Sequence, residues 1–337
     1  MEISNRRYIG CKTKLLDFIY NTIMEYNIKP NAVFADIFAG TGVVANYFAE
    51  KQFNTILNDT LYSNVVAYYA WLGEGQLDVN KLNNYLKLFN SLSPDNIENN
   101  YFSDVYGGKY YSLEDAKIIG YIRDYIENNK NDLSYREYCY LITSLIYAAD
   151  KIANTVGHFE SFLSKPPQTK GVRLSPLNIH SNISPAQIFN EDANDLVRKI
   201  SCNIAYIDPP YNARQYVNFY HVLENLARWN KPVQFEGNSM KFPRKELKSN
   251  YCRSKAPELM DDLVQHIDAD LIVVSYNNTY KAGSISSVNT IMPEQLVDIL
   301  SRRGNVVVKE MDYRAFNSGK TELNGHKELL YVCEVKK

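Results

Sequence analysis

Apolar residues recur at helical spacing near the start of the chain and then gather in short runs typical of buried strands. A helix is predicted over residues 13–27, where one stripe carries Leu15, Leu16, Phe18, Ile19, Ile23 and Met24. Residues 32–38 are apolar except for Asp36, and residues 55–57 form a second run, so both segments are predicted to be strands. Between them lie Gly40-Thr41-Gly42 and a helical segment over 43–48. This order predicts the start of a doubly wound parallel α/β sheet.

The pattern changes over residues 61–185, where strands and helices do not alternate. The first part is helical and ends in a strong helical pattern over 134–153, and the segment 154–182 is polar and rich in Gly, Pro, Ser and Lys. We therefore expect residues 61–185 to be an inserted, mainly helical region, carried by a sheet domain made of residues 1–60 and 186–337.

Strand patterns return after the insertion. Apolar runs occur at residues 188–189, 203–207, 271–275, 305–308 and 328–333. The last two should pair as an antiparallel hairpin, because their connection is too short for a helical crossover.

Overall charge is close to zero, with 37 basic and 38 acidic residues in 337 and a net charge of -1. A polyanion could therefore be held only by local clustering of Lys and Arg. The densest basic stretch is 228–255, with eight basic and two acidic residues. It could be a solvated loop or a surface that contacts phosphates, and we expect the second.

The five cysteines are dispersed and contain no Cys-x-x-Cys pair. This spacing argues against a zinc site and a disulfide framework, and no metal is expected. The N-terminus has no apolar signal core, and no run of about 18 apolar residues occurs. The sequence therefore predicts a cytoplasmic protein with no membrane span.

The turn after the first strand has the character of a ligand-binding loop. Small residues in Asp36-Ile37-Phe38-Ala39-Gly40-Thr41-Gly42 allow close approach of a ligand to the backbone. Asp59 ends the next strand, where its carboxylate could accept both ribose hydroxyls of a nucleoside cofactor. The alternative is a plain tight turn. The loop is not Gly-x-Gly-x-x-Gly and no Walker lysine follows, so a phosphate cradle is not indicated.

A more specific signal is Asp208-Pro209-Pro210-Tyr211, which directly follows the strand 203–207. The prolines fix the backbone and leave rigid carbonyl acceptors. An aromatic amine is a poor nucleophile, and acceptors on Asp208 and Pro209 could each take one of its N–H groups and aim its lone pair at a methyl group. Tyr211 could stack on the base. The alternative is a proline-capped loop.

Three motifs in this order carry a resemblance to a family: Arg7-Tyr8-Ile9-Gly10-Cys11-Lys12, Phe38-Ala39-Gly40-Thr41-Gly42 and Asp208-Pro209-Pro210-Tyr211. Together they resemble the Dam-like (alpha-class) adenine-specific DNA methyltransferases of restriction–modification systems. The segments 208–221 and 154–159 are similar to the FokI methylase-like branch. The resemblance implies a Rossmann-like S-adenosylmethionine-dependent methyltransferase sheet.

The resemblance also implies roles for individual residues. The catalytic tetrapeptide is Asp208, Pro209, Pro210 and Tyr211. Contacts to S-adenosylmethionine fall on Tyr8, Gly10, Lys12, Asp36, Phe38, Gly40, Thr41, Asp59, Asp192 and Asp208. Asp59 matches the acid that holds the ribose, and Asp192 the acid that holds the cofactor's adenine amine. Cys11 departs mildly from the family, which often has Ser or Gly there. Tyr313 and Phe316 are both candidates for the last aromatic motif.

Double-stranded DNA is the implied partner, with a flipped adenine as the acceptor. The motif order places target recognition in the insertion. DNA contacts are expected at Lys165, Arg173, Arg214, Lys241, Arg244, Lys245 and Lys248. A separately encoded restriction endonuclease and a monomer or weak dimer are further expectations.

Two kinds of alternative remain open at this point. The same chemistry could act on cytosine in DNA, on adenine in RNA or on a glutamine side chain, although Asp208 favours adenine by family habit. A relative that binds DNA without catalysis is the second alternative, and the intact motifs argue against it.

Overall fold

The computed structural model describes residues 1–180, 182–279, 288–312 and 327–336. It divides into two compact units. The sheet unit comprises Gly10–Thr60, Asn182–Tyr216 and Leu247–Lys337, and the helical unit comprises Met1–Ile9, Leu61–Ser181 and Val217–Glu246.

A seven-stranded mixed sheet forms the centre of the sheet unit, with the order β3-β2-β1-β4-β5-β7-β6. Its strands are β1 (Val33–Asp36), β2 (Asn54–Asn58), β3 (Gln187–Phe189), β4 (Ser201–Ile207), β5 (Asp268–Asn277), β6 (Gly304–Asp312) and β7 (Lys327–Val335). The first five are parallel, and β7 is antiparallel to both β5 and β6. The predicted α/β fold class and the closing antiparallel hairpin are confirmed. The sequence did not reveal that β7 lies between β5 and β6.

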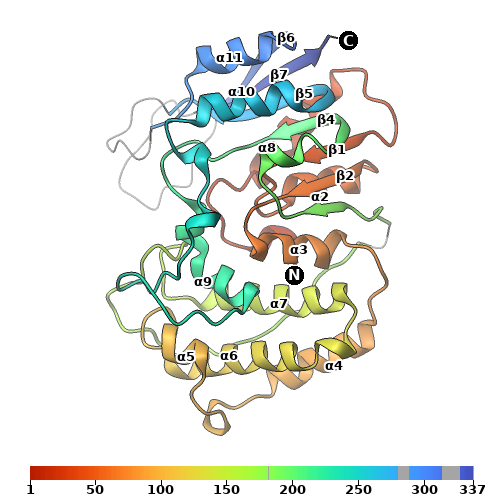
Figure 1. The fold of residues 1–337 in the computed structure, drawn as a ribbon. Coiled ribbons are helices and arrows are strands. Elements are labelled where there is room, and N and C mark those ends of the chain that lie inside the picture. Colours follow the sequence, from red (N-terminus) through yellow and green to blue (C-terminus); the bar gives the residue numbers. More distant parts are fainter. Residues whose placement is uncertain (181, 280–287, 313–326, 337) are drawn as a thin grey trace. The chain divides into compact units, whose positions relative to one another are not determined.

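Alternate residues of these strands face opposite sides of the sheet. Ala35, Ile37 and Ile207 belong to a buried core that also contains residues of α10 (Ala256–His266) and α11 (Pro293–Ser301). Helices α1 (Leu16–Met24) and α2 (Val43–Glu50) belong to the other side, where Phe34 stacks on Phe48 with ring centroids 3.8 Å apart. Figure 1 shows α10 and α11 beside β5, β6 and β7, the strands from the C-terminal part of the chain. The short helix α8 (Ala193–Leu196) precedes β4.

The carboxyl ends of the parallel strands lie level with one another. Asp36 pairs in register with Leu57 of β2 and with Tyr206 of β4. Residues that immediately follow these strands therefore meet at one edge of the sheet, which is the edge where ligands bind in this class of fold.

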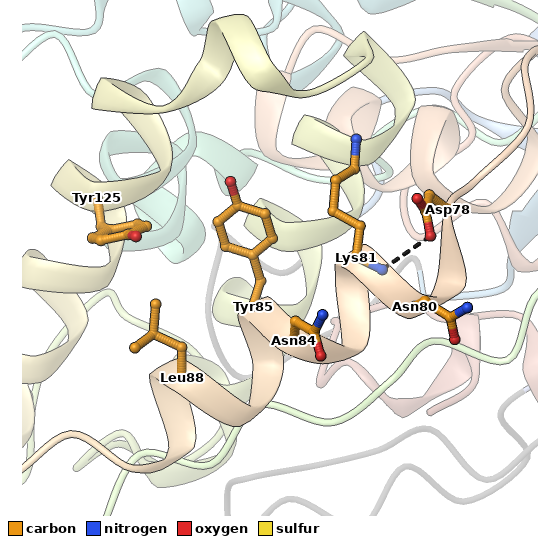
Figure 2. Close-up of a pocket in the computed structure, with 7 residues that line it drawn as sticks. All are labelled: Asp78, Asn80, Lys81, Asn84, Tyr85, Leu88 and Tyr125. Carbon is orange, nitrogen blue, oxygen red and sulfur yellow. Dashed lines mark hydrogen bonds between the residues drawn. The ribbon is translucent and has the colours of Figure 1, made fainter.

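The helical unit packs α3 (Tyr62–Leu72), α4 (Val79–Asn90), α5 (Tyr101–Tyr106), α6 (Leu113–Asn128) and α7 (Tyr135–Ile152) together with most of α9 (Tyr216–Arg228). In Figure 1, α6 and α7 run side by side. Side chains cap the N-termini of four helices, which satisfies backbone N–H groups there: Asp78, Asn100, Ser112 and Ser134. A shallow groove between α4 and α6, drawn in Figure 2, has mixed charge and offers no basic surface for a polyanion.

The helical unit is larger than the expected insertion 61–185, because Met1–Ile9 and Val217–Glu246 group with it. Long-range contacts explain the grouping of the N-terminus. The Tyr147 hydroxyl donates to the Ile3 carbonyl at 2.7 Å, and the backbone N–H of Ile9 donates to the Tyr220 hydroxyl at 2.7 Å. None of the described helices is long and apolar enough to cross a membrane.

Candidate active site

The Gly-rich loop after β1 is shaped by its own backbone and by Asp59. Gly40 has a φ of 55° and Gly42 a φ of 80°, which is the left-handed region that favours glycine. The backbone N–H of Gly40 donates to Oδ2 of Asp59 at 3.0 Å. Asp59 therefore holds this loop, in addition to the ribose role expected for it.

Asn58 at the end of β2 joins three strand ends. Its Nδ2 donates to the Ile37 carbonyl at 3.2 Å and to the Glu191 carbonyl at 3.1 Å, and its Oδ1 accepts from the Glu191 backbone N–H at 3.0 Å. The amide fixes the segments that carry Asp59 and Asp192. Asn58 was not predicted as a site residue, although an amide at the end of an apolar strand and next to a predicted ligand acid is a readable signal.

Asp36 is a buried carboxyl without a firm internal partner. Its residue is 1% exposed, and neither carboxyl oxygen accepts a hydrogen bond of normal geometry from the described residues. Burial, followed by the nearby Asp208, raises the pKa of Asp36 well above its usual value. A buried carboxyl of this kind is costly unless a cation or donor meets it, so it fits the ammonium group of a bound amino-acid moiety.

The segment Gly10-Cys11-Lys12 lies against the same loop. Sγ of Cys11 is 3.8 Å from Oγ1 of Thr41, so the two motifs meet in space. Phe38 packs edge-on against Tyr251, with ring centroids 5.0 Å apart.

Two residues that are expected to contact the cofactor make other contacts in the structure. Asp192 is exposed and caps α8, where one of its carboxylate oxygens accepts from the Asn194 backbone N–H at 2.9 Å. Tyr8 belongs to the helical unit, where its ring stacks on Tyr220 at 4.6 Å. Their contacts to a cofactor stay predictions.

The catalytic tetrapeptide begins where β4 ends, at the carboxyl edge of the sheet. The Tyr211 hydroxyl donates to Oδ1 of Asp208 at 2.5 Å, and the Tyr211 ring packs against Tyr276 with centroids 4.6 Å apart. Burial raises the pKa of Asp208, whereas the neighbouring Lys12 and the Tyr211 hydrogen bond oppose this rise. Tyr211 thus supports the Asp208 carboxylate directly. Its expected stacking on a base stays a prediction.

Lys12 connects the N-terminal motif to the tetrapeptide. Its Nζ lies 3.1 Å from Oδ1 of Asp208 and donates to the Tyr211 hydroxyl at 2.7 Å. Lys12 was expected to serve the cofactor, and the structure gives it a direct contact with the catalytic carboxylate.

Two further residues of this cluster were not predicted. Oε2 of Glu328 lies 3.7 Å from Nζ of Lys12 and 3.5 Å from the Tyr211 hydroxyl. The Ser275 hydroxyl lies 3.2 Å from the Tyr211 hydroxyl. Glu328 sits near the start of β7, and because β7 is antiparallel its start lies at the carboxyl edge of the sheet, paired with Asn277 at the end of β5. The readable signal was one acidic residue directly before the apolar run 329–333.

Residues expected to contact phosphates occupy different environments. Arg244 is 6% exposed, and its guanidinium donates to Asn218 Oδ1 at 2.8 Å and to Glu236 Oε2 at 2.9 Å. The structure therefore shows an intramolecular role for Arg244. Lys245 and Arg214 are exposed, Lys241 and Lys248 are half-buried, and burial lowers the pKa of Lys241.

The polar segment 154–180 has no helix or strand and is ordered by side chains. The Asp115 carboxylate accepts from the backbone N–H groups of Lys170 and Gly171, at 2.9 and 3.0 Å. Lys165 is exposed, whereas Arg173 donates to the Asn90 carbonyl at the end of α4 at 2.5 Å. Tyr313 and Phe316 lie outside the described residues.

No group of three or more His, Cys, Asp or Glu side chains that could hold a metal ion occurs in the part of the chain that the structure describes.

Comparison with known proteins places these features in a family. The model of the D12 class N6 adenine-specific DNA methyltransferases matches residues 8–284. Modification methylase StsI of Streptococcus sanguinis is 37% identical, over 98% of this chain and 52% of the relative. Type II methyltransferase M.NlaIII of Neisseria lactamica is 31% identical, over 97% of this chain and 98% of the relative.

Type II methyltransferase M.FokI of Planomicrobium okeanokoites is 32% identical, over 93% of this chain and 50% of the relative. The chain thus spans about half the length of the StsI and FokI methylases and nearly all of M.NlaIII. The resemblance drawn from the three motifs is confirmed, and the chain belongs to the family of D12 class N6 adenine-specific DNA methyltransferases.

Proposed function

We propose that this chain transfers a methyl group from S-adenosylmethionine to the exocyclic amino group of adenine in double-stranded DNA. The observation that carries the proposal is the Asp208 carboxylate at the end of β4, held by Tyr211 and Lys12. Family membership supports the same reaction.

The residues around the Gly-rich loop fit the methyl donor. Asp36 would face its ammonium group, Asp59 its ribose hydroxyls and Asp192 its adenine amine, with Gly10, Phe38, Gly40 and Thr41 lining the path between them. When bound, S-adenosylmethionine supplies a methyl group on a positively charged sulfur. The N-terminus of α2 directly follows Gly42 and would favour the carboxylate of the same ligand.

The chain's own contribution to the reaction is to hold and orient the acceptor amine. Asp208 accepts one N–H of the amine, and the carbonyl of Pro209 accepts the other. This arrangement favours a pyramidal nitrogen with its lone pair free, and preorganised acceptors of this kind usually contribute more to rate acceleration than any other single effect. The base must leave the duplex first, because its amine is paired inside it.

DNA would be held by two separate sets of residues. Lys241, Lys245 and Lys248, with Arg214, would contact phosphates, which position the duplex but carry no sequence information. Base readout would fall mainly on the segment 154–180, with Lys165 as an exposed candidate. Target recognition by the helical unit is part of this proposal.

A cognate restriction endonuclease encoded separately would make the modification protective. Two relatives are named as a modification methylase and a type II methyltransferase. We propose a monomer or weak dimer as the working form. Methylation of cytosine in DNA or of adenine in RNA is the alternative on the same site.

Expression in a host without its own DNA methylation tests the proposal. Sequencing that detects modified bases should find N6-methyladenine at one short recurring sequence, and Asp208→Ala, expressed at the same level, should leave the genome unmodified. Methylation only on cytosine, or only on RNA, would change the assigned acceptor. Cofactor binding without any methylation would favour the non-catalytic alternative.

A further inference from the structure

The ammonium group of Lys12 lies between the buried carboxylate of Glu328 and the half-buried carboxylate of Asp208 in the sheet unit. Nζ is 3.1 Å from Oδ1 of Asp208 and 3.7 Å from Oε2 of Glu328. The side chain of Lys12 is 5% exposed, that of Glu328 7% and that of Asp208 16%. Both distances fall within the range of an ion pair, so the lysine can pair with either acid after a small movement.

This geometry conflicts with the proposed chemistry unless Lys12 moves. The acceptor amine needs the same Asp208 carboxylate on which the ammonium now rests, and both groups are hydrogen-bond donors. An ammonium paired with Asp208 also weakens the pull of that carboxylate on the amine. The lysine must therefore give up Asp208 when the base arrives.

A buried ammonium cannot simply lose its partner. Breaking a buried ion pair by removing one member is strongly destabilising, because an uncompensated charge remains. Lysine carries three donors on a flexible four-carbon stem, so a short swing to a second acid is available to it. Glu328 is that second acid. The Tyr211 hydroxyl contacts both Lys12 and Glu328, since it lies 2.7 Å from Nζ of Lys12 and 3.5 Å from Oε2 of Glu328.

We propose that Glu328 is a positioning residue that receives Lys12 when the acceptor amine occupies Asp208. In this scheme the lysine holds the Asp208 site while no base is present, and Glu328 sets how readily it leaves. Glu328 itself does not touch the substrate. The inference rests on the proposed methylation of an amine at Asp208.

The test uses four forms of the full chain: wild type, Glu328→Gln, Lys12→Met and the double variant. Single-turnover methyl transfer is measured with saturating S-adenosylmethionine on the DNA sequence that genomic sequencing identifies. Glu328→Gln should be roughly tenfold slower, because Lys12 stays on Asp208, and this size is typical of a coupled buried pair. The double variant should be faster than Glu328→Gln, because the competing ammonium is gone.

That recovery is what a purely structural role of Glu328 would not produce. Two independent losses multiply, so a double variant slower than Glu328→Gln would overturn the inference, and so would a wild-type rate in Glu328→Gln. An active wild type with either result leaves the proposed function intact. A wild type that methylates no amine removes the proposed function and this inference together.

Two further variants control for charge and folding. Glu310→Gln removes an exposed acid from the neighbouring strand β6 and should keep the wild-type rate. Glu328→Asp retains the charge and should recover most of the lost rate. If Glu328→Gln does not fold, Glu328→Ala takes its place in the comparison. A rate in Glu328→Asp as low as in Glu328→Gln would contradict the requirement for an acid here.

Discussion

The Asp59 carboxylate accepts a hydrogen bond from the backbone N–H of Gly40 at 3.0 Å. One acid thus fixes the Gly-rich loop and stands at the end of β2, where the ribose of a nucleoside cofactor is expected. Asn58, the preceding residue, holds this strand end against Ile37 and Glu191. Loop shape and ribose recognition are therefore expected to depend on the same side chain.

Asp59→Ala should weaken binding of S-adenosylmethionine by about 1–3 kcal/mol, the cost of leaving polar partners unsatisfied. Calorimetric titration measures the change. Asp17→Ala is a matched control in the same unit. Asp17 is an exposed acid of α1 that accepts a hydrogen bond from the Tyr47 hydroxyl of α2. Equal affinities of Asp59→Ala and wild type would contradict the placement of the ribose.

Asp208→Asn should lower the single-turnover rate by ~100- to 1000-fold, the usual effect of removing one preorganised group from an active site. Affinity for S-adenosylmethionine should fall far less than the rate, because the carboxylate acts mainly on the acceptor amine even though the resemblance also gives it a cofactor contact. The measurement combines rapid-quench kinetics with titration of the cofactor. A near-normal rate would exclude Asp208 as the acceptor of the amine hydrogen bond.

Asp36→Asn should stabilise the free protein at neutral pH while weakening cofactor binding. Burial raises the pKa of Asp36 above its usual value, so the folded state holds this proton more tightly than the unfolded state does. Below its unfolded pKa of about 4 the carboxyl is neutral in both states, so no charge has to be buried on folding. The free energy of unfolding then decreases as pH rises above that value.

The advantage of Asp36→Asn over wild type in the free energy of unfolding should accordingly grow as pH rises from about 4. Denaturant unfolding of the cofactor-free protein at several pH values measures it. An advantage that is constant with pH, or larger in acid, would show that Asp36 is not a buried acid with a raised pKa.

Much of the sheet could be predicted because its strands are apolar and short and carry turn residues at their ends. Ala35 and Ile37 belong to one face and Phe34 to the other, so the run around them had to be a two-sided buried strand. The spacing of Ala256, Met260 and Leu263 would also have predicted α10. The position of β7 between β5 and β6 depends on long-range pairing, which periodicity does not encode.

The candidate site was predictable where its residues follow strands in sequence, as Asp59 and Asp208 do. Glu328 was not, because its place at the carboxyl edge follows from the antiparallel insertion of β7. The grouping of Met1–Ile9 with the helical unit was also unpredictable, since it depends on contacts with residues such as Tyr147 and Tyr220 far along the chain.

The basic stretch 228–255 combines two kinds of cation, and the difference is testable. Lys241, Lys245 and Lys248 are exposed or half-buried, whereas Arg244 is buried against Glu236 and Asn218. Replacing the three lysines with Gln should weaken binding to every DNA sequence about equally. The slope of log K against log salt should become shallower by roughly 0.9 for each phosphate that the variant no longer neutralises.

Arg244→Gln should act on stability instead, because it removes charge-assisted hydrogen bonds to Asn218 of α9 and to Glu236, at a cost of about 1.5–3 kcal/mol. Its salt slope should match wild type, as measured by binding titrations at several salt concentrations on cognate and mismatched duplexes.

Lys165→Ala should keep the slope and relax discrimination at particular base pairs. Arg173→Ala should also loosen the end of α4, where it bonds the Asn90 carbonyl. If the lysine variant kept its full salt slope but lost sequence preference, the basic stretch 228–255 would read bases and not contact phosphates. That result would contradict the proposed roles of 228–255 and 154–180.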